Sequence, residues 1–410
     1  MTEYAGLSPD LNRLIQGRPP ESGELLRSLS VGLDSLTEFL GRHYLEDYIP
    51  QGGSKIKFVT GRPGSGKTHF ARLLLAQAGE KGYLTVSFSA KEIWLHDFRE
   101  VYLEILRQCD IERVLSGCAG QIVRELGYRP EDIPPDRSFL DYLLDRGEGD
   151  ALSRGEIRSA LRRYFTRNSL LDNCFAACCS LLTGGLLGHP ALENASRELL
   201  LGYLHGDKTV KLSQLRALGL SPSGITRFNA RHLLRSLAEV VRLAGYKGLL
   251  VLIDDMETLL VRAAASPIHY TKLRREDTYE SIRQLIDDID SMRYVLFLFC
   301  FDRELMDNEN YGMKSYQALW LRIQNEIVSA RFNRFADILD LDRYADEAYD
   351  SDTLCAMSRR LAEVLRSGGV EASPISPETA AGLAERAQFG GVGLPCLVNR
   401  EVVEGGIEHG

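Results

Sequence analysis

Five short apolar runs along the chain have the length of buried strands. The clearest is Leu249–Ile253, whose uninterrupted apolar character is typical of a strand covered on both faces of a parallel sheet. Two aspartates follow this run directly, so we refer to it as the acidic strand. The pattern predicts strands at 55–60, 83–90, 249–253, 293–301 and 336–342.

Apolar residues at helical spacing occupy much of the remaining chain. The stretch after the first strand carries Phe70, Leu73, Leu74 and Ala78 on one face and ends at glycines. Similar patterns precede the first strand, lead into the acidic strand and fill the last part of the chain. Helices are predicted at 8–17, 31–49, 67–82, 229–246, 352–369 and 376–391.

The order of these elements divides the chain into three parts. Residues 1–50 form an N-terminal helical segment, 51–342 contain all five strands, and 343–410 form a small helical lid. The second strand and the acidic strand are too far apart for a single crossover, so a helical insertion must occupy most of 91–229. The predicted fold class is therefore α/β, with a parallel sheet, a large helical insertion and a small C-terminal helical lid.

The stretch "GRPGSGKT", Gly61 to Thr68, stands between the first strand and the helix that follows it. This is the G-x-x-x-x-G-K-T pattern of a P-loop, in which backbone N–H groups cradle phosphate oxygens. Lys67 would reach the β- and γ-phosphates of ATP, and Thr68 would bind Mg²⁺. A glycine-rich turn with a chance lysine is the alternative. The predicted ATP-binding residues are Gly61, Pro63, Gly64, Ser65, Gly66, Lys67, Thr68 and His69.

The acidic strand supplies candidates for the metal and for catalysis. Asp254 ends this strand and would hold Mg²⁺ together with Thr68. Asp255 stands where ATPases of this type carry the Glu that polarises the attacking water, and Glu257 is two residues further on. Alternatively, the two aspartates cap the following helix. Since Asp255 is one methylene shorter than Glu, we expect hydrolysis to be slow.

The order of elements is that of an ATPase of the AAA+ kind: a P-loop strand comes first, then an acidic strand, and finally a helical tail. Such proteins place an arginine before the last strand, where it reaches the γ-phosphate held by a neighbouring subunit. Arg331 and Arg334 are the candidates for this catalytic role, with Arg322 a third. Arg400, after a proline in the lid, is a candidate for sensing nucleotide. Each of these arginines also fits an ordinary solvated helix face.

Composition excludes several classes of protein. The net charge of −8 argues against non-specific nucleic-acid binding by the whole surface. No apolar run approaches the roughly 18 residues that span a bilayer, and the first residues do not resemble a signal peptide. The cysteines form no C-x-x-C pair, and Cys174, Cys178 and Cys179 share one apolar segment. We therefore expect a cytoplasmic protein whose cysteines are small core residues.

One local charge pattern stands out in the insertion. Arg154, Arg158 and Arg162 are four residues apart, so they would share one helix face. Such a stripe fits the phosphates of DNA or an acidic partner protein. A solvated helix face is the alternative.

Several phrases together resemble the ATP-binding P-loop proteins of bacterial BREX phage-defence systems, of the BrxD type. They are "KFVTGRPGSGKTHFARLL", "FNARHLLRSLAEVVRLAGYKGLLVLIDDMETLL", "TYESIRQLIDDID" and "YQALWLRI". The chain departs from the expected pattern at Asp255 and at "FCFDREL", where Cys300 or Asp302 would have to replace a small polar sensing residue.

The resemblance implies an ATP-binding and ATP-hydrolysing component of a defence system. Such a protein would use ATP and Mg²⁺, form a homo-oligomer, and assemble on DNA with other defence proteins, including a helicase-like partner. Two alternatives stay open. One is a DNA-handling loader or initiator outside defence, and the other is a nucleotide-dependent scaffold with little or no hydrolysis.

Overall fold

The computed structural model describes residues 7–261, 268–324 and 331–408. Its centre is a five-stranded, all-parallel sheet with the order β2-β3-β4-β1-β5. All five strands predicted from the apolar runs are present, so the predicted α/β fold with a parallel sheet is confirmed. Their bounds are β1 Ser54–Gly61, β2 Leu84–Ser89, β3 Leu249–Asp254, β4 Val295–Asp302 and β5 Ile338–Asp340.

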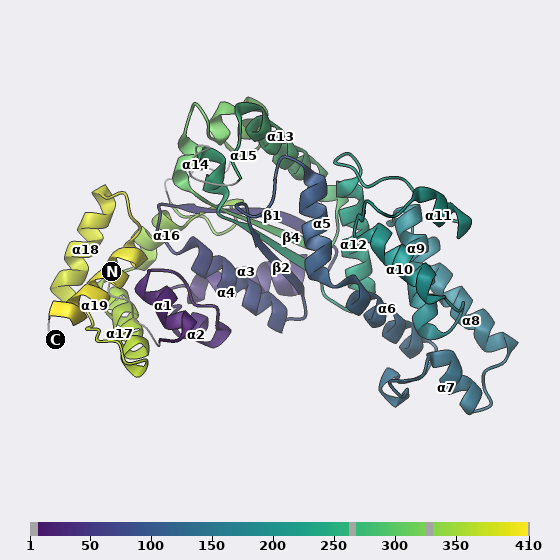
Figure 1. Cartoon of the computed structure of the whole chain (residues 1–410). Coiled ribbons are helices and arrows are strands. Elements are labelled where there is room, and N and C mark those ends of the chain that lie inside the picture. The colour runs from purple at the N-terminus through teal and green to yellow at the C-terminus, as the bar shows by residue number, and fades with distance from the viewer. Residues whose placement is uncertain (1–6, 262–267, 325–330, 409–410) are drawn as a thin grey trace.

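Alternate residues of the central strands face two different cores, as the period of two requires. Leu250 and Leu298 pack against the helices on one face of the sheet. Val251 and Phe297 pack against the helices on the other face. The first core is closed by α3 Asp34–Leu40, η1 Gly41–Tyr48 and α4 Lys67–Glu80; the second is closed by α5 Phe98–Cys109 and α13 Lys272–Asp288 (Figure 1). The sheet is thus buried on both sides.

Strand register brings four chain segments to one edge of the sheet. Gly61 at the end of β1 is level with Asp302 at the end of β4. Ser89 at the end of β2 is level with Asp254 at the end of β3. Because all strands are parallel, the loops that follow them meet at this carboxyl edge, where α/β proteins bind their ligands.

A helical arm extends away from the sheet at the end opposite the lid (Figure 1). The segment predicted as an insertion starts with α5, which packs on β2 and on the sheet, and the arm itself begins at α6. In the centre of the arm lies α9, which is apolar all round and buries Cys174, Cys178 and Cys179. These three cysteines are therefore core residues, as predicted, whereas Cys355 and Cys396 are only partly buried. The helices are α6 Ile111–Glu125, η2 Pro130–Asp132, α7 Phe139–Asp145, α8 Ala151–Leu161, η3 Arg162–Thr166, α9 Asn173–Leu187, α10 Asn194–Leu204 and α11 Leu212–Ala217.

The remaining helices connect the strands. The chain returns from the arm through α12, which packs on α5 and leads into β3. A short 3₁₀ turn, η4, follows β3 directly. Their bounds are α12 Ala230–Leu243, η4 Met256–Leu260, η6 Ile289–Ser291, α14 Arg303–Asp307, η7 Met313–Ser315, α15 Gln317–Ile323 and α16 Leu341–Ala348.

The lid consists of three helices, α17 Ser351–Ser367, α18 Pro377–Phe389 and α19 Leu394–Glu408. The apolar pattern predicted the first two and missed the third. The N-terminal helix α1 Pro9–Ile15 packs into the same core through Leu11 and Leu14, so the N-terminal segment and the lid lie together (Figure 1). Helix α2 Gly23–Ser28 packs instead on α4. No helix in the described part of the chain is long and apolar enough to cross a membrane.

Candidate nucleotide-binding site

The P-loop connects β1 to α4 and leaves the start of that helix open. Gly64 and Gly66 have φ angles of 77° and 90°, which favour glycine, and Gly66, as the N-cap residue, has no side chain to cap the first turn of α4. The free N–H groups and the helix dipole therefore favour an anion at this position. The Ser65 hydroxyl is buried and has no hydrogen-bond partner among the described residues. The loop fits the phosphates of a nucleotide.

Lys67 is held at the edge of the sheet by three oxygen atoms. Its Nζ donates to the carbonyls of Gly61 at 3.3 Å and Arg62 at 2.9 Å. It also lies 2.8 Å from Oδ1 of Asp302, at the end of β4. Of the two residues considered for the sensing position, Asp302 reaches the P-loop, whereas Cys300 is buried in the sheet's core. The apolar run at 293–301 predicts the strand but not this ion pair.

Thr68 and Asp254 lie together, as the P-loop motif requires for a metal. The Thr68 side chain lies beside the Asp254 carboxylate and favours its charged form. Burial raises the pKa of Asp254, against the opposing effects of Thr68 and of the backbone N–H of Asp255. A hydroxyl and a carboxylate are oxygen ligands that suit Mg²⁺, which takes its other ligands from water and phosphate.

The side chain of Asp255 is hydrogen-bonded to two residues, one at the end of β2 and one just after it. Its oxygens accept from Lys91 Nζ at 2.6 Å and from the Ser89 hydroxyl at 2.7 Å. Burial raises the pKa of Asp255, but these two hydrogen bonds outweigh it and lower the pKa overall. The residue has a φ of 59° and makes no side-chain cap to η4, which argues against the helix-capping alternative.

Glu257 differs from Asp255 in its electrostatic environment. It is partly buried, and its carboxylate lies 3.8 Å from Lys91 Nζ. Burial, and then the negative charges of Asp302 and Asp255, raise the pKa of Glu257 to about 7. A carboxyl group with a pKa near neutrality is well suited to accept a proton.

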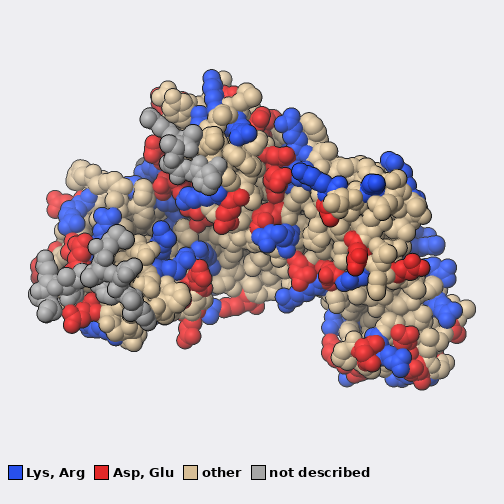
Figure 2. Space-filling model, viewed as in Figure 1, with Lys and Arg blue, Asp and Glu red and all other residues tan. Residues whose placement is uncertain are grey.

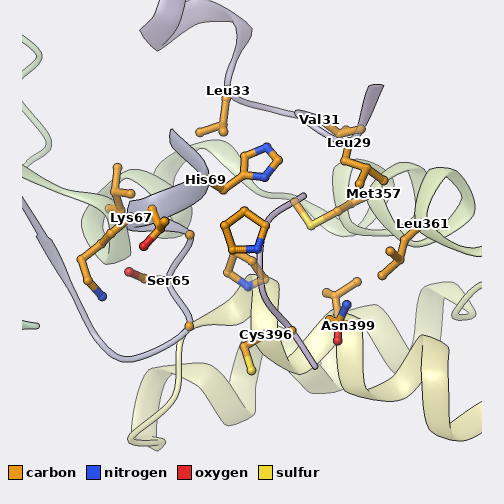
Figure 3. A pocket seen from close by; sticks show the side chains of 18 of the residues that line it. Leu29, Val31, Leu33, Ser65, Lys67, His69, Met357, Leu361, Cys396 and Asn399 are labelled. Atoms are coloured by element: carbon orange, nitrogen blue, oxygen red, sulfur yellow. The ribbon is translucent and has the colours of Figure 1, made fainter. Parts of the chain in front are cut away.

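A cavity of about 290 Å³ opens beside the P-loop. Gly64 to His69 line it, whereas Gly61 and Pro63 do not. The opposite wall is largely apolar and comes from segments that sequence reasoning did not assign to the site (Figure 3). It includes Leu29, Val31 and Leu33 of the N-terminal segment and Met357, Leu361, Cys396 and Asn399 of the lid. This combination of a phosphate cradle and an apolar wall fits the two ends of a nucleotide.

His69 contributes to this cavity as a neutral ring. Burial, and then the charge of Arg72, lower the pKa of His69 to about 4. Its Nε2 lies 2.7 Å from the Ser30 hydroxyl of the N-terminal segment. His69 therefore ties the P-loop helix to that segment without adding a charge near the phosphates.

The predicted arginines do not reach the cavity of their own chain. Arg334 is exposed before β5 and stacks over the Phe39 ring at 5.2 Å, and Arg331 is also exposed. Arg322 is paired with Asp287, 3.1 Å away on α13. Arg400 is exposed on α19 and does not line the cavity, although its neighbour Asn399 does.

The arginine stripe of the arm is exposed, as its spacing predicts. Arg154 and Arg158 lie on α8, and Arg162 begins η3. Arg158 and Arg162 line a shallow groove of about 240 Å³ together with Arg167. No described carboxylate pairs with these arginines, and Lys and Arg side chains recur along the outer edge of the arm (Figure 2). The neighbouring Arg163, by contrast, is paired with Glu125.

The comparison with known proteins agrees with this site. Residues 10–404 match the family described as "BREX system ATP-binding protein BrxC/D". No curated protein and no solved structure was found that matches the chain. The family match covers almost the whole chain, including the P-loop, the arm and the lid. The chain therefore belongs to the family of BREX system ATP-binding proteins, BrxC/D.

Proposed function

We propose that this protein hydrolyses ATP with Mg²⁺ and that its nucleotide state controls its assembly with other BREX proteins on DNA. One observation carries the proposal of hydrolysis. The P-loop, the Thr68–Asp254 pair and Glu257 share the carboxyl edge of the sheet, beside a cavity with an apolar wall. ATP binding is the property that the family name prints; hydrolysis and assembly are the steps we add.

Lys67 and the metal ligands would divide the charge of the triphosphate. Bound Mg²⁺ would neutralise phosphate charge and orient the γ-phosphate, held by the Thr68 hydroxyl and the Asp254 carboxylate. Lys67 would exchange its contact with Asp302 for one with the phosphates. The first turn of α4 would donate its free N–H groups to the same oxygens.

We assign the general base to Glu257 in preference to Asp255. Glu257 has a pKa of about 7 and so accepts a proton readily near neutral pH. Asp255 is hydrogen-bonded to Lys91 and Ser89, which lowers its pKa and restricts its movement. In this assignment Asp255 holds Lys91 in place at the side of the site.

Binding and turnover are tested separately. Lys67→Ala should abolish ATP binding in a titration with Mg²⁺, because the remaining N–H groups cannot balance the triphosphate charge. Lys81→Ala is the matched control, since Lys81 lies at the far end of α4 and pairs with Glu46. Equal loss in both variants, or no loss in either, would contradict the site.

For turnover, Glu257→Gln should lower the rate of phosphate release by about 100-fold or more while ATP still binds. Asp255→Asn should have a smaller effect. The reverse result would return the role of base to Asp255. A wild-type protein that binds Mg²⁺–ATP without releasing phosphate would favour a nucleotide-dependent scaffold, an alternative that the locked Asp255 also supports.

The arm supports the proposal of DNA assembly. Its exposed stripe of Arg154, Arg158 and Arg162, which has no carboxylate partner among the described residues, provides local positive charge on a chain whose net charge is −8. Burial, and then the charges of Arg158 and Arg154, lower the pKa of His189. The two arginines and His189 therefore lie in one electropositive region. Such a region fits the phosphates of nucleic acid.

A further inference from the structure

The lid is attached directly to the P-loop by backbone hydrogen bonds. The N–H of Gly393 donates to the carbonyl of Pro63 at 2.9 Å, and the N–H of Cys396 donates to the carbonyl of Gly64 at 3.2 Å. Both donors lie where α18 ends and α19 begins. The turn between the last two helices of the lid therefore rests on the phosphate-binding loop itself.

The side chain of Arg62, the second residue of the P-loop, adds two hydrogen bonds to this attachment. Its Nη1 donates to the carbonyls of Ala387 and of Gly390, the latter at 2.9 Å. Both carbonyls lie at the C-terminal end of α18, where a helix leaves carbonyl groups without partners and where a cation is favoured. The guanidinium of Arg62 thus completes the end of a lid helix.

The other end of the same side chain is held by the core. Nε of Arg62 lies 3.2 Å from Oδ2 of Asp342, which also accepts the backbone N–H of Arg62 at 2.8 Å. Asp342 is buried, with 4% of its side chain exposed, and Arg303 approaches the same oxygen to 3.2 Å. Since Arg303 directly follows Asp302, the partner of Lys67, this network begins beside the phosphate site.

The lid and the P-loop approach each other closely at two glycines. A Cβ on Gly393 would lie 2.4 Å from the backbone of Ser65, and a Cβ on Gly64 would lie 2.4 Å from Cβ of Cys396. Neither position has room for even one additional carbon atom, so the lid and the loop are in close backbone contact. A change in P-loop conformation must therefore move the lid or break the bonds between them.

We propose that Arg62 is a positioning residue that couples the P-loop to the lid, so that ATP affinity and lid closure depend on each other. The side chain makes no contact with the cavity and acts only through the loop and the end of α18. Coupling of this kind is reciprocal and typically changes affinity by about 5- to 150-fold. The ATP-affinity part of this inference rests on the proposed function, whereas the lid part does not.

The first experiment measures lid closure without nucleotide. Cys396 lies against the P-loop in the cavity, whereas Cys355 is a half-buried cysteine on α17. In the full chain, Arg62→Ala should raise the rate of N-ethylmaleimide labelling of Cys396 relative to Cys355 by about fivefold or more. An unchanged ratio, measured by mass spectrometry of the two peptides, would overturn the proposal.

Two further variants separate coupling from general damage. Arg62→Lys keeps a cation beside Asp342 but cannot bind both lid carbonyls, so its labelling ratio should lie between wild type and Arg62→Ala. Arg386→Ala is the matched control, because Arg386 is an exposed arginine of α18 that pairs with Glu401 inside the lid. If Arg386→Ala raises the ratio as much as Arg62→Ala, the effect belongs to the lid alone and the proposal fails.

The second experiment measures ATP affinity in the same variants. Arg62→Ala should weaken ATP binding by at least fivefold, with Arg386→Ala close to wild type. If the wild-type protein fails to bind ATP, the proposed function is contradicted. The labelling result alone then tests whether Arg62 holds the lid against the P-loop. Normal ATP affinity in Arg62→Ala, with wild-type binding intact, would contradict the coupling. If Arg62→Ala does not fold, the same comparison with Arg62→Lys decides the matter.

Discussion

Lys67 of the P-loop and Asp302 of β4 form an ion pair across the edge of the sheet, with Nζ and Oδ1 2.8 Å apart. The register of β1 and β4 makes this pair possible, because it places Gly61 level with Asp302. A triphosphate and Asp302 would compete for the same ammonium group. We therefore expect this carboxylate to influence ATP affinity as well as to hold Lys67 in place.

We expect Asp302→Asn to tighten ATP binding by roughly three- to tenfold, because it removes a competing and repelling charge that is partly exposed to solvent. Titration of ATP in the presence of Mg²⁺ measures the change. Asp307→Asn is the control, since Asp307 ends α14 and pairs with Lys314 away from the P-loop. Unchanged or weaker binding in Asp302→Asn would show that the pair does not oppose ATP.

The rate of hydrolysis should rise with pH through about 7. Glu257 has a raised pKa of about 7, so its proton-accepting form increases as the pH passes that value. Initial rates of phosphate release at saturating ATP between pH 6 and pH 8.5 measure this profile. A rate that does not change over this range would remove Glu257 as the base.

Glu257 should also affect stability in a defined direction. Its pKa is about 7 in the folded chain and 4.5 ordinarily, so between these values the folded state holds a proton that the unfolded state has lost. Its contribution to the free energy of unfolding therefore falls as the pH rises from 4.5 to 7. In thermal melts, the stability of Glu257→Gln minus that of wild type should be larger at pH 8 than at pH 5. A difference independent of pH would show that the carboxyl group is not perturbed.

An arginine supplied by a neighbouring subunit should make turnover depend on assembly. Arg334 is exposed and does not line the cavity of its own chain, so in a catalytic role it would act on ATP held by another copy. Mixing Arg334→Ala with Lys67→Ala should restore activity, because each variant retains the part that the other lacks. Arg322→Ala, which loses the ion pair with Asp287 and a hydrogen bond to the Ala318 carbonyl on α15, is the control for Arg334→Ala. A mixture no more active than its components would direct the test to Arg331.

DNA binding by the arm should be steeply sensitive to salt. Each lost phosphate contact lowers the slope of log K, the DNA association constant, against log salt by roughly 0.9 on duplex DNA. Replacing Arg158 and Arg162 by Ala should therefore flatten this slope by about two. The matched control replaces Arg163 and Arg124, which are already paired with Glu125 and Glu131. Fluorescence anisotropy at several salt concentrations measures both slopes. Equal slopes in both double variants would identify the stripe as a solvated face.

Local pattern was sufficient to predict the sheet and the phosphate loop. Buried parallel strands are continuous apolar runs, so all five strands were recognisable without knowledge of their partners. The P-loop is a contiguous motif whose strand and helix flank it directly. The last lid helix, α19, was missed because its sequence, "LPCLVNREVVEGGIE", contains a glycine pair and a weak apolar period.

Only the tertiary structure decided how the site is completed. The ion pair of Lys67 with Asp302, the contact of Arg62 with the end of α18, and the apolar wall from both ends of the chain join segments far apart in sequence. The raised pKa of Glu257 arises mainly from burial in the folded chain, and no local pattern records it. The sequence by itself determined the strands, the P-loop and the acidic residues, because these depend on neighbours along the chain. The choice between Asp255 and Glu257 and the attachment of the lid depend on neighbours in space, since desolvation and charge act through distance.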